Sequence, residues 1–306
     1  MKVLVATQKP FSATAVKGIK EIVEGAGYEF SALEKYPEQA DLVKAVADVD
    51  ALIIRSDKVT AEVLEAAKNL KIVVRAGAGY DNVDLAAATA HNVVVMNTPG
   101  QNANAVAELA IAMMIYMCRT QFTPATGCEI MGKKLGVQAF GNVGRLVGKK
   151  AEALGMEVMA IDPFIPADKI RELGAEPADS LEHLYGSCDF VSIHIPATPE
   201  TIGSINYDLI TKMPKGACLV NTARKEVIDE AGLLKALEDR QDLKYVTDVA
   251  PDNYETLREK FGLRVFATPK KMGAQTAEAN LNAGLAAARQ IVDFFKTGNT
   301  RFQVNK

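Results

Sequence analysis

The chain has 306 residues, of which 48% are hydrophobic and 24% are charged, a balance typical of a globular protein large enough for two domains. Its formal net charge of −3, its lack of tryptophan and its aromatic content of 6% argue against a nucleic-acid-binding protein. We find no apolar run long enough to span a bilayer and no signal segment, so we expect a cytoplasmic protein without a membrane partner.

The cysteines and histidines do not predict a metal site. The cysteines are Cys118, Cys128, Cys188 and Cys218, which are widely spaced and form no CxxC pair. The histidines are His91, His183 and His194, which have no helical ligand spacing. We therefore expect reduced, structural thiols and no metal.

Two series of β-rich runs follow one another along the chain. They are separated by amphipathic, helix-like stretches such as residues 13–25, 61–68, 146–154 and 230–237. The first series comprises residues 2–6, 28–32, 51–55, 71–75 and 93–97. The second comprises residues 134–139, 157–162, 190–195, 217–222, 245–249 and 264–267. Nearly continuous apolar strands that alternate with helices are typical of parallel sheets covered on both faces. We therefore predict an α/β protein with two doubly wound, Rossmann-like domains.

Two long predicted helices indicate how these domains are connected. A helix over residues 103–119 leaves the first series of strands, and a short connector over residues 120–134 leads into the second. A helix over residues 274–297 follows the last strand and could return the chain to the first domain. We predict a discontinuous outer domain, residues 1–98 plus 275–306, and a central domain, residues 99–274, with no third, regulatory domain.

A glycine-rich turn between a strand and a helix predicts a dinucleotide site in the central domain. The run LGVQAFGNVG, residues 135–144, is a G-x-G-x-x-G fingerprint in which Ala139 replaces the first glycine. Gly141 would let the backbone approach a pyrophosphate, and Gly144 would allow the helix to pack closely on the strand. Amides at the helix start, including Asn142 and Val143, would hold the phosphates. The alternative is a structural turn whose glycines serve packing alone.

The following strand predicts which dinucleotide binds. It ends at Asp162, 18 residues after Gly144, where a carboxylate typically accepts hydrogen bonds from the adenosine ribose hydroxyls. A carboxylate there also repels a 2′-phosphate, so we predict NAD rather than NADP.

Several other segments resemble the D-isomer-specific 2-hydroxyacid dehydrogenase family. They are VVMNTPG (94–100) followed by AEL (107–109), DFVSIHIP (189–196) followed by TPET (198–201), and LVNTAR (219–224). They occur in family order over nearly the whole chain. The resemblance implies hydride transfer between NAD and a small 2-hydroxy acid that is bound by the outer domain. It also implies a homodimer formed through the cofactor domain, although the connector is shorter than its family counterpart.

The resemblance also implies roles for single residues. Arg224 would clamp the substrate carboxylate and polarise the 2-keto oxygen, because a guanidinium stays charged and donates in a planar fork. The alternative is a solvated charge at a helix start. Asp248 matches the family acid near the nicotinamide amide. The other residues assigned to the cofactor are Ala78, Ile195, Pro196, Thr222, Ala223, Gly273 and Ala274, with Arg224 also beside it. Those assigned to the substrate are Ala76, Gly77 and Asn102. The glycine-rich loop over residues 76–79 would hold the substrate carboxylate through its backbone amides.

The chain departs from the family at the general acid/base. Family members place a histidine after a Thr-Pro pair, but here residues 268–273 read TPKKMG. Counting back from Gly273 puts Lys271 in the histidine position and makes Lys270 an inserted residue. The carboxylate that normally pairs with the histidine is replaced by Asn253. Either a lysine carries the proton, Lys271 or its neighbour Lys270, or the chain has lost catalysis and binds only the nucleotide.

Cations at predicted strand ends of the outer domain indicate the substrate. Arg55 and Arg75 end neighbouring strands, and Lys58 follows closely, which suits a phosphorylated hydroxy acid. The loop over residues 75–84 resembles that of family members acting on 3-phosphoglycerate. We therefore predict NAD-dependent oxidation of 3-phosphoglycerate to 3-phosphohydroxypyruvate, a step towards serine. The alternatives are a hydroxypyruvate or glyoxylate reductase, a D-lactate dehydrogenase, or an NAD-sensing, corepressor-like binding protein. The alternative interpretation of the cations is that Arg55 and Lys58 are plain surface charges near Asp57.

Overall fold

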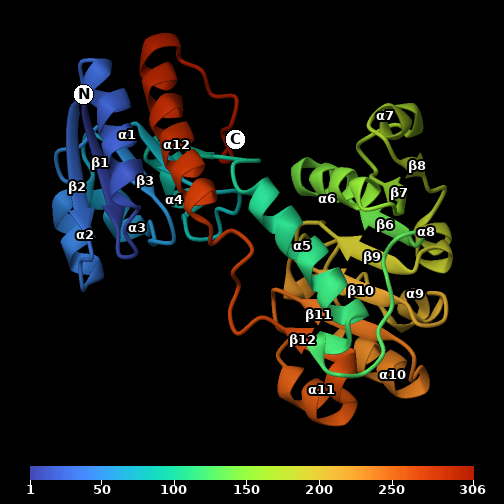
Figure 1. Ribbon diagram of the computed structural model, residues 1–306. Coiled ribbons are helices and arrows are strands. Elements are labelled where there is room, and N and C mark those ends of the chain that lie inside the picture. Colours follow the sequence, from blue (N-terminus) through green and yellow to red (C-terminus); the bar gives the residue numbers. More distant parts are fainter. The chain divides into compact units, whose positions relative to one another are not determined.

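The computed structural model describes residues 1–306 and divides into two compact units (Figure 1). Unit 1 consists of Met1–Asn102 and Gln275–Lys306, and unit 2 consists of Ala103–Ala274. Each unit is built on one sheet whose strands are all parallel, with helices on both faces. The predicted α/β fold class with two Rossmann-like sheets is therefore confirmed. No helix has the length and apolar character needed to cross a membrane.

The sheet of unit 1 has the strand order β2-β1-β3-β4-β5. Its strands are β1 (Lys2–Thr7), β2 (Glu29–Glu34), β3 (Ala51–Ile54), β4 (Ile72–Arg75) and β5 (Val94–Asn97). Its helices are α1 (Ala13–Gly25), α2 (Gln39–Ala45), α3 (Ala61–Ala66), α4 (Leu85–Ala90) and α12 (Ala277–Thr297). The order reverses between β1 and β3, and ligands of such sheets bind beyond the carboxyl ends of the strands at this switch point.

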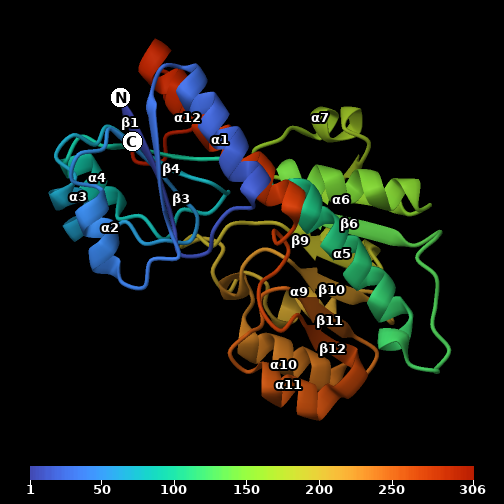
Figure 2. The same ribbon diagram turned by 60° about the vertical axis from the view of Figure 1, so that its left-hand side comes forward.

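The last helix returns the chain to unit 1 by packing against the first (Figure 2). α12 runs alongside α1 on one face of the sheet, and it begins after the N-cap Thr276, whose hydroxyl accepts from the amide of Ala279 at 3.1 Å. Glycines allow this close approach: a Cβ on Gly18 would lie 2.6 Å from Leu285. Burial of the two facing apolar stripes therefore joins two segments that are distant in the sequence.

The sheet of unit 2 has the strand order β12-β11-β10-β9-β6-β7-β8. Its strands are β6 (Lys134–Gln138), β7 (Glu157–Ile161), β8 (Glu176–Pro177), β9 (Phe190–Ile193), β10 (Cys218–Asn221), β11 (Lys244–Thr247) and β12 (Val265–Ala267). Its α-helices are α5 (Ala103–Cys118), α6 (Asn142–Ala153), α7 (Ala167–Glu172), α8 (Leu181–Ser187), α9 (Tyr207–Thr211), α10 (Glu230–Asp239) and α11 (Tyr254–Phe261). Short 3-10 turns cover Thr120–Phe122, Lys225–Val227 and Gly262–Arg264. The switch point lies between β6 and β9, the usual dinucleotide position.

The structure corrects the starts of two predicted helices and adds one strand that was not predicted. The helix after the glycine turn begins at Asn142, four residues before the predicted 146–154 helix, because Gly141 serves as its N-cap. The last helix begins at Ala277 rather than residue 274. β8 was not predicted, since its two residues are too few to show a pattern.

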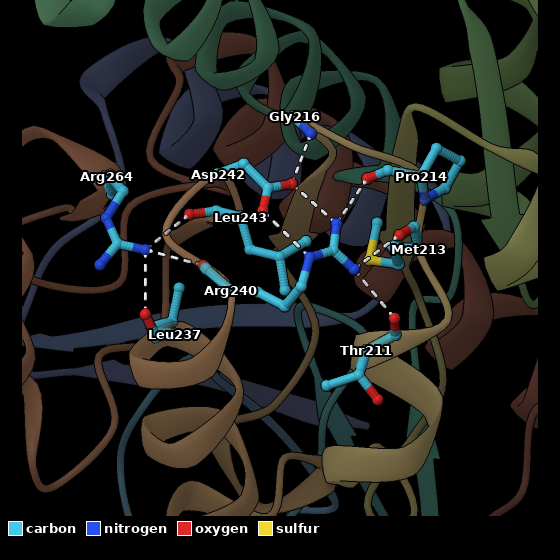
Figure 3. Close-up of polar contacts among 9 residues, drawn as sticks. All are labelled: Thr211, Met213, Pro214, Gly216, Leu237, Arg240, Asp242, Leu243 and Arg264. Carbon is cyan, nitrogen blue, oxygen red and sulfur yellow. Dashed lines mark hydrogen bonds and ion pairs between the residues drawn. The ribbon is translucent and has the colours of Figure 1, made fainter.

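Two arginines fasten the amino edge of the unit 2 sheet, away from the predicted cofactor residues (Figure 3). Arg240 binds the carboxylate of Asp242 through Nε at 3.0 Å and Nη2 at 2.7 Å, and it also donates to the carbonyls of Thr211, Met213 and Pro214. This pair holds the pKa of Asp242 well below its usual range. Arg264 donates to three further carbonyls, those of Leu237, Arg240 and Leu243. The side chains of these two arginines thus hold the backbone of the loops that lead into β10 and β11.

Candidate active site

The turn between β6 and α6 has the backbone geometry that a pyrophosphate site requires. Ala139 has φ +72°, the left-handed region that a glycine adopts more easily. A Cβ on Gly144 would collide with the carbonyl oxygen of Ala139, whereas a Cβ on Gly141 would meet nothing within 4 Å. Gly144 therefore serves close helix packing, and the space above Gly141 stays open beside the free amides that begin α6.

Asp162, just after β7, is held against this turn. Its Oδ2 accepts the amide of Phe140 at 2.8 Å, and its Oδ1 accepts the amide of Phe164 at 2.9 Å. Each carboxylate oxygen has further acceptor capacity, so the group can also receive ribose hydroxyls. Asp162 therefore does two things at once: it fixes the glycine turn and presents negative charge beside it.

The segment after β9 supplies an apolar wall and a half-buried imidazole. Ile195 is buried, and Pro196 is exposed at the start of a loop. The carbonyl of Pro196 accepts from the hydroxyl of Thr201 at 2.6 Å. The His194 ring lies 2.9 Å from the hydroxyl of Ser192, and burial lowers the pKa of His194 to about 3. A ring that is neutral near pH 7 cannot replace the missing family histidine as a proton donor.

The segment after β10 holds Arg224 at the carboxyl edge of the sheet. Asn221 is fully buried. Its side-chain Nδ2 donates to the backbone carbonyl of Arg224 at 2.9 Å, and its side-chain Oδ1 accepts from the backbone amide of Ala223 at 2.9 Å. These two bonds fold residues 222–224 into a fixed turn. The neighbouring Thr222 hydroxyl is buried without a protein partner, which marks a position where a bound group can supply the missing hydrogen bond.

Asp248, just after β11, anchors the segment that carries the two lysines. Its carboxylate is 1% exposed and accepts from the hydroxyl of Thr268 at 2.8 Å, the amide of Met272 at 2.9 Å and the amide of Gly273 at 2.8 Å. The Thr268 hydroxyl also lies 3.0 Å from the carbonyl of Lys270. Both ends of the exposed turn over residues 269–271 are therefore fixed by one buried carboxylate.

We expect Thr268→Val to destabilise the protein, because it removes a hydroxyl that donates to a buried carboxylate while keeping the side-chain volume. The expected loss in the free energy of unfolding is about 1.5–3 kcal/mol, the range for hydrogen bonds to charged groups. Urea unfolding measures it. Thr268→Ser keeps the hydroxyl and serves as the control, so equal losses for the two variants would contradict the assigned bond.

Arg55, just after β3 in unit 1, is tied into the unit by several groups. Its guanidinium donates to the carbonyls of Lys9 at 2.8 Å and Pro10 at 3.1 Å, bonds the side chain of Asn280, and lies 5.1 Å from the ring centre of Phe11. Burial lowers the pKa of Arg55. Several of the N–H groups of Arg55 therefore donate to other groups of unit 1. This structural role comes in addition to the two interpretations from the sequence, a phosphate contact and a plain surface charge.

Arg75 and the glycine-rich loop after β4 form a compact group in unit 1. The Arg75 Nε donates to the carbonyl of Arg55 at 3.0 Å. Gly77 has φ +149°, and a Cβ there would collide with the Arg75 guanidinium, so only glycine suits this position. Ala76 and Gly77 are buried, whereas Ala78 is exposed and its carbonyl accepts from the side chain of Asn97 at 2.6 Å.

The predicted residues therefore fall into two groups, each at the carboxyl edge of its own sheet. The predicted cofactor residues lie in unit 2, between Gly141 and Ala274, except for Ala78, which lies in unit 1. The substrate set, including the half-buried Asn102, lies in unit 1. The structure describes each group within its own unit.

Sequence reasoning missed the residues that hold these groups in place. Asn221 and Thr268 lay within quoted motifs, but nothing in the motifs indicated their hydrogen bonds. Asp57 was treated as a neighbour of surface charges, yet it is 3% exposed and accepts from the amide of Gln8 and the hydroxyl of Tyr36, both at 2.7 Å. A carboxylate three residues after the end of the apolar strand β3 was the only available signal.

The residues present in unit 2 fit a dinucleotide. The open space over Gly141, the amides at the start of α6, the carboxylate of Asp162 and the unpartnered hydroxyl of Thr222 provide sites for a pyrophosphate, a ribose and an additional polar group. The site is thus defined by its geometry as well as by the fingerprint.

Comparisons with known proteins agree with this geometry. The family model described as "D-isomer specific 2-hydroxyacid dehydrogenase, catalytic domain" matches residues 4–305. A solved structure of NAD+-bound 3-phosphoglycerate dehydrogenase from Entamoeba histolytica has a TM-score of 0.90 and 48% identity, and the match covers 100% of this chain and 99% of that one.

Two curated relatives differ in name and length. Hydroxypyruvate reductase of Thermotoga maritima is 38% identical over 282 residues, which cover 86% of this chain and 90% of the relative. D-3-phosphoglycerate dehydrogenase of Archaeoglobus fulgidus is 36% identical over 325 residues, which cover 100% of this chain but only 59% of the relative. The match extends across both units of the fold, and the chain belongs to the D-isomer-specific 2-hydroxyacid dehydrogenase family, whose members are NAD-dependent oxidoreductases.

Proposed function

We propose that this dehydrogenase oxidises 3-phosphoglycerate to 3-phosphohydroxypyruvate with NAD. The observation that carries the proposal is the carboxyl edge of the unit 1 sheet, where the Arg75 side chain, held over Gly77, donates to the carbonyl of Arg55, and where Lys58 follows Arg55 by three residues. Cations at the ligand edge of such a sheet suit a phosphate dianion. The similarity to the Entamoeba histolytica enzyme, which is named for this substrate, supports the same choice.

The residues proposed to act on the reacting carbon all belong to unit 2. Arg224, fixed by Asn221, clamps the substrate carboxylate and polarises the oxygen on C2. Lys271 removes the proton from the C2 hydroxyl during oxidation and returns it during reduction. Bound NAD supplies the hydride acceptor. Asp248 holds the loop from which Lys271 projects.

The register of this loop favours Lys271 over Lys270. Met272 and Gly273 are both fixed on Asp248, so Lys271 lies immediately before the anchored end. The carbonyl of Lys270 turns back to the Thr268 hydroxyl, as expected of an extra residue accommodated in the turn.

The test of the overall proposal is the appearance of nicotinamide absorbance when the protein and NAD are mixed with one substrate at a time. We expect turnover with 3-phosphoglycerate and much slower turnover with D-glycerate or D-lactate. Faster reduction of hydroxypyruvate or glyoxylate than of 3-phosphohydroxypyruvate would instead support the function named for the Thermotoga maritima relative.

We also propose that the protein forms a homodimer through unit 2. Sedimentation equilibrium tests whether the protein is a dimer.

We expect Asp162→Ala to shift cofactor preference away from NAD. Loss of the carboxylate removes ribose hydrogen bonds from NAD and the repulsion of the 2′-phosphate of NADP. The ratio of the two dissociation constants should change by at least about tenfold, or about 1.4 kcal/mol. Because Asp162 also braces the glycine turn, both cofactors should bind somewhat less tightly. The ratio cancels that shared loss, so an unchanged ratio would refute the ribose assignment.

We expect Arg75→Met to raise the KM for 3-phosphoglycerate far more than the KM for D-glycerate. A charge-assisted contact is worth about 1.5–3 kcal/mol, which corresponds to a roughly 10- to 150-fold difference between the substrates. Steady-state kinetics with both substrates measures it. Lys44→Met, an exposed cation on α2, is the control for a loss of positive charge in the same unit. Equal effects on the two substrates would make Arg75 a structural residue.

A further inference from the structure

Three of the four cysteines gather at the amino edge of the unit 2 sheet, opposite the cofactor edge. Cys118 ends α5, Cys128 lies in the connector before β6, and Cys218 begins β10. All three line one cavity of about 210 Å³. The same cavity is lined by the lysines Lys133, Lys215 and Lys244. The proposed reaction uses none of these residues.

The backbone brings Cys118 and Cys128 together across the end of α5. The amide of Cys128 donates to the carbonyl of Cys118 at 2.8 Å. Opposite residues of an antiparallel ladder have Cα atoms about 4.5–5.5 Å apart, and the single 2.8 Å bond holds these two backbones similarly close. Disulfide-bonded cysteines have Cα separations of about 4.4–6.8 Å, so the pair can be bridged with little backbone movement. A Cβ on the adjacent Gly127 would collide with the same carbonyl, so glycine there preserves the approach.

The two thiols differ in how readily they react. Cys128 is exposed, whereas Cys118 is 4% exposed. Burial raises the pKa of Cys118 to about 12, the nearby Cys128 adds to this rise, and Lys244 and Lys133 act in the opposite direction. At neutral pH Cys118 therefore keeps its proton, and Cys128 is the sulfur that a dissolved oxidant meets first, next to cationic side chains.

The third cysteine is a weaker partner for Cys128. Cys218 is 1% exposed within β10, and its thiol lies 3.9 Å from the carbonyl of Leu219. Its backbone is fixed in the sheet by pairing with β9 and β11. No backbone bond joins Cys218 to the connector, whereas one joins Cys118 to it. The pairing of Cys128 with Cys118 is therefore favoured by the chain itself.

We propose that Cys128 and Cys118 form a reversible, peroxide-sensitive thiol pair. The Cys128 sulfur attacks one peroxide oxygen, giving a sulfenic acid on Cys128 and releasing water from hydrogen peroxide. The Cys118 sulfur then attacks the Cys128 sulfur and forms the S–S bond, while the Cys118 proton passes to the departing hydroxyl group, which leaves as a second water. Two thiols are oxidised, one peroxide is reduced, and a dithiol reductant reverses the change. The disulfide ties residues 119–127 into a closed loop and protects Cys128 from further oxidation.

The arrangement of tryptic sites makes the pair directly measurable. Trypsin cleaves after Arg75, Arg119, Lys133, Lys215 and Arg224, so Cys118, Cys128 and Cys218 fall in the separate peptides 76–119, 120–133 and 216–224. The full-length protein is treated with hydrogen peroxide, alkylated, digested without reductant and analysed by mass spectrometry. We expect the cross-linked pair 76–119 with 120–133, its loss after treatment with dithiothreitol, and no cross-link to 216–224.

Matched variants separate pairing from simple exposure. In Cys118→Ser, Cys128 should accumulate sulfinic acid at least about tenfold more than in the wild type, because no resolving thiol is present. Cys188→Ser removes a buried thiol outside this cavity and should leave the cross-link unchanged. A cross-link to 216–224, a Cys128–Cys128 link between two chains, or equal sulfinic acid with and without Cys118 would each overturn the proposal. Should Cys118→Ser fail to fold, the wild-type peptide map alone decides.

Discussion

Arg224→Lys should lower turnover by about 10²-fold or more while leaving NAD binding nearly unchanged. Lysine keeps the positive charge but has no planar fork, so it cannot bind a carboxylate through two parallel hydrogen bonds and also polarise the oxygen on C2. The structure favours a large effect, because Asn221 fixes the backbone of residues 222–224 and so leaves the shorter lysine head no means of adjusting.

The control for this substitution is Arg258→Lys, which makes the same change at an exposed position on α11. Turnover is measured with saturating NAD, and NAD affinity is measured separately by the quenching or transfer of fluorescence on binding. The assignment of Arg224 as the carboxylate clamp would have to be abandoned if Arg224→Lys kept ordinary values of kcat and KM.

The fold was largely predictable because its strongest signals are local. Strands such as β3 (Ala51–Ile54) are buried along their whole length and therefore appear in the sequence as short, unbroken apolar runs. The glycine fingerprint likewise placed one strand, one turn and one helix in order. Boundaries were less accurate: the helix begins at Asn142, four residues before the first residue of the predicted helix, and β8 is too short to have a pattern.

The candidate site was predictable where chemistry depends on residue type and less so where it depends on distant hydrogen bonds. Gly141, Asp162 and Arg224 could be assigned because their spacing or motif carries the information. The support for the lysine segment could not, because Asp248 and Thr268 are brought together only by the pairing of β11 with β12. The several partners of Arg55 depend on α12 and on the first loop, which the sequence places far from it.

The hydrogen bonds of Asp248 and Thr268 hold the segment that carries Lys271, the residue that stands where other family members have a histidine. Substitution of Lys271 should cause the largest loss of turnover that we expect. Lys271→Met should lower turnover by roughly 10²–10⁴-fold and leave NAD binding nearly intact, because it removes the group that transfers the proton. In the wild type, oxidation should become faster as the pH rises and the ammonium loses its proton, and reduction should become slower over the same range. Lys271→Met should remove this pH dependence, which a merely structural substitution would not do.

Lys270→Met is the matched control, since it makes the same change one residue away in the same exposed turn. Lys270→Met should lower turnover much less than Lys271→Met. The carbonyl of Lys270 accepts from the Thr268 hydroxyl, as expected of an inserted residue. Lys271, in contrast, directly precedes Met272 and Gly273, whose amides donate to the buried carboxylate. If the two variants exchanged their effects, the inserted residue would be Lys271 and the proton carrier Lys270. If both kept the wild-type rate and pH profile, proton transfer would have to pass through water or another acid, because the lowered pKa of His194 keeps that ring neutral.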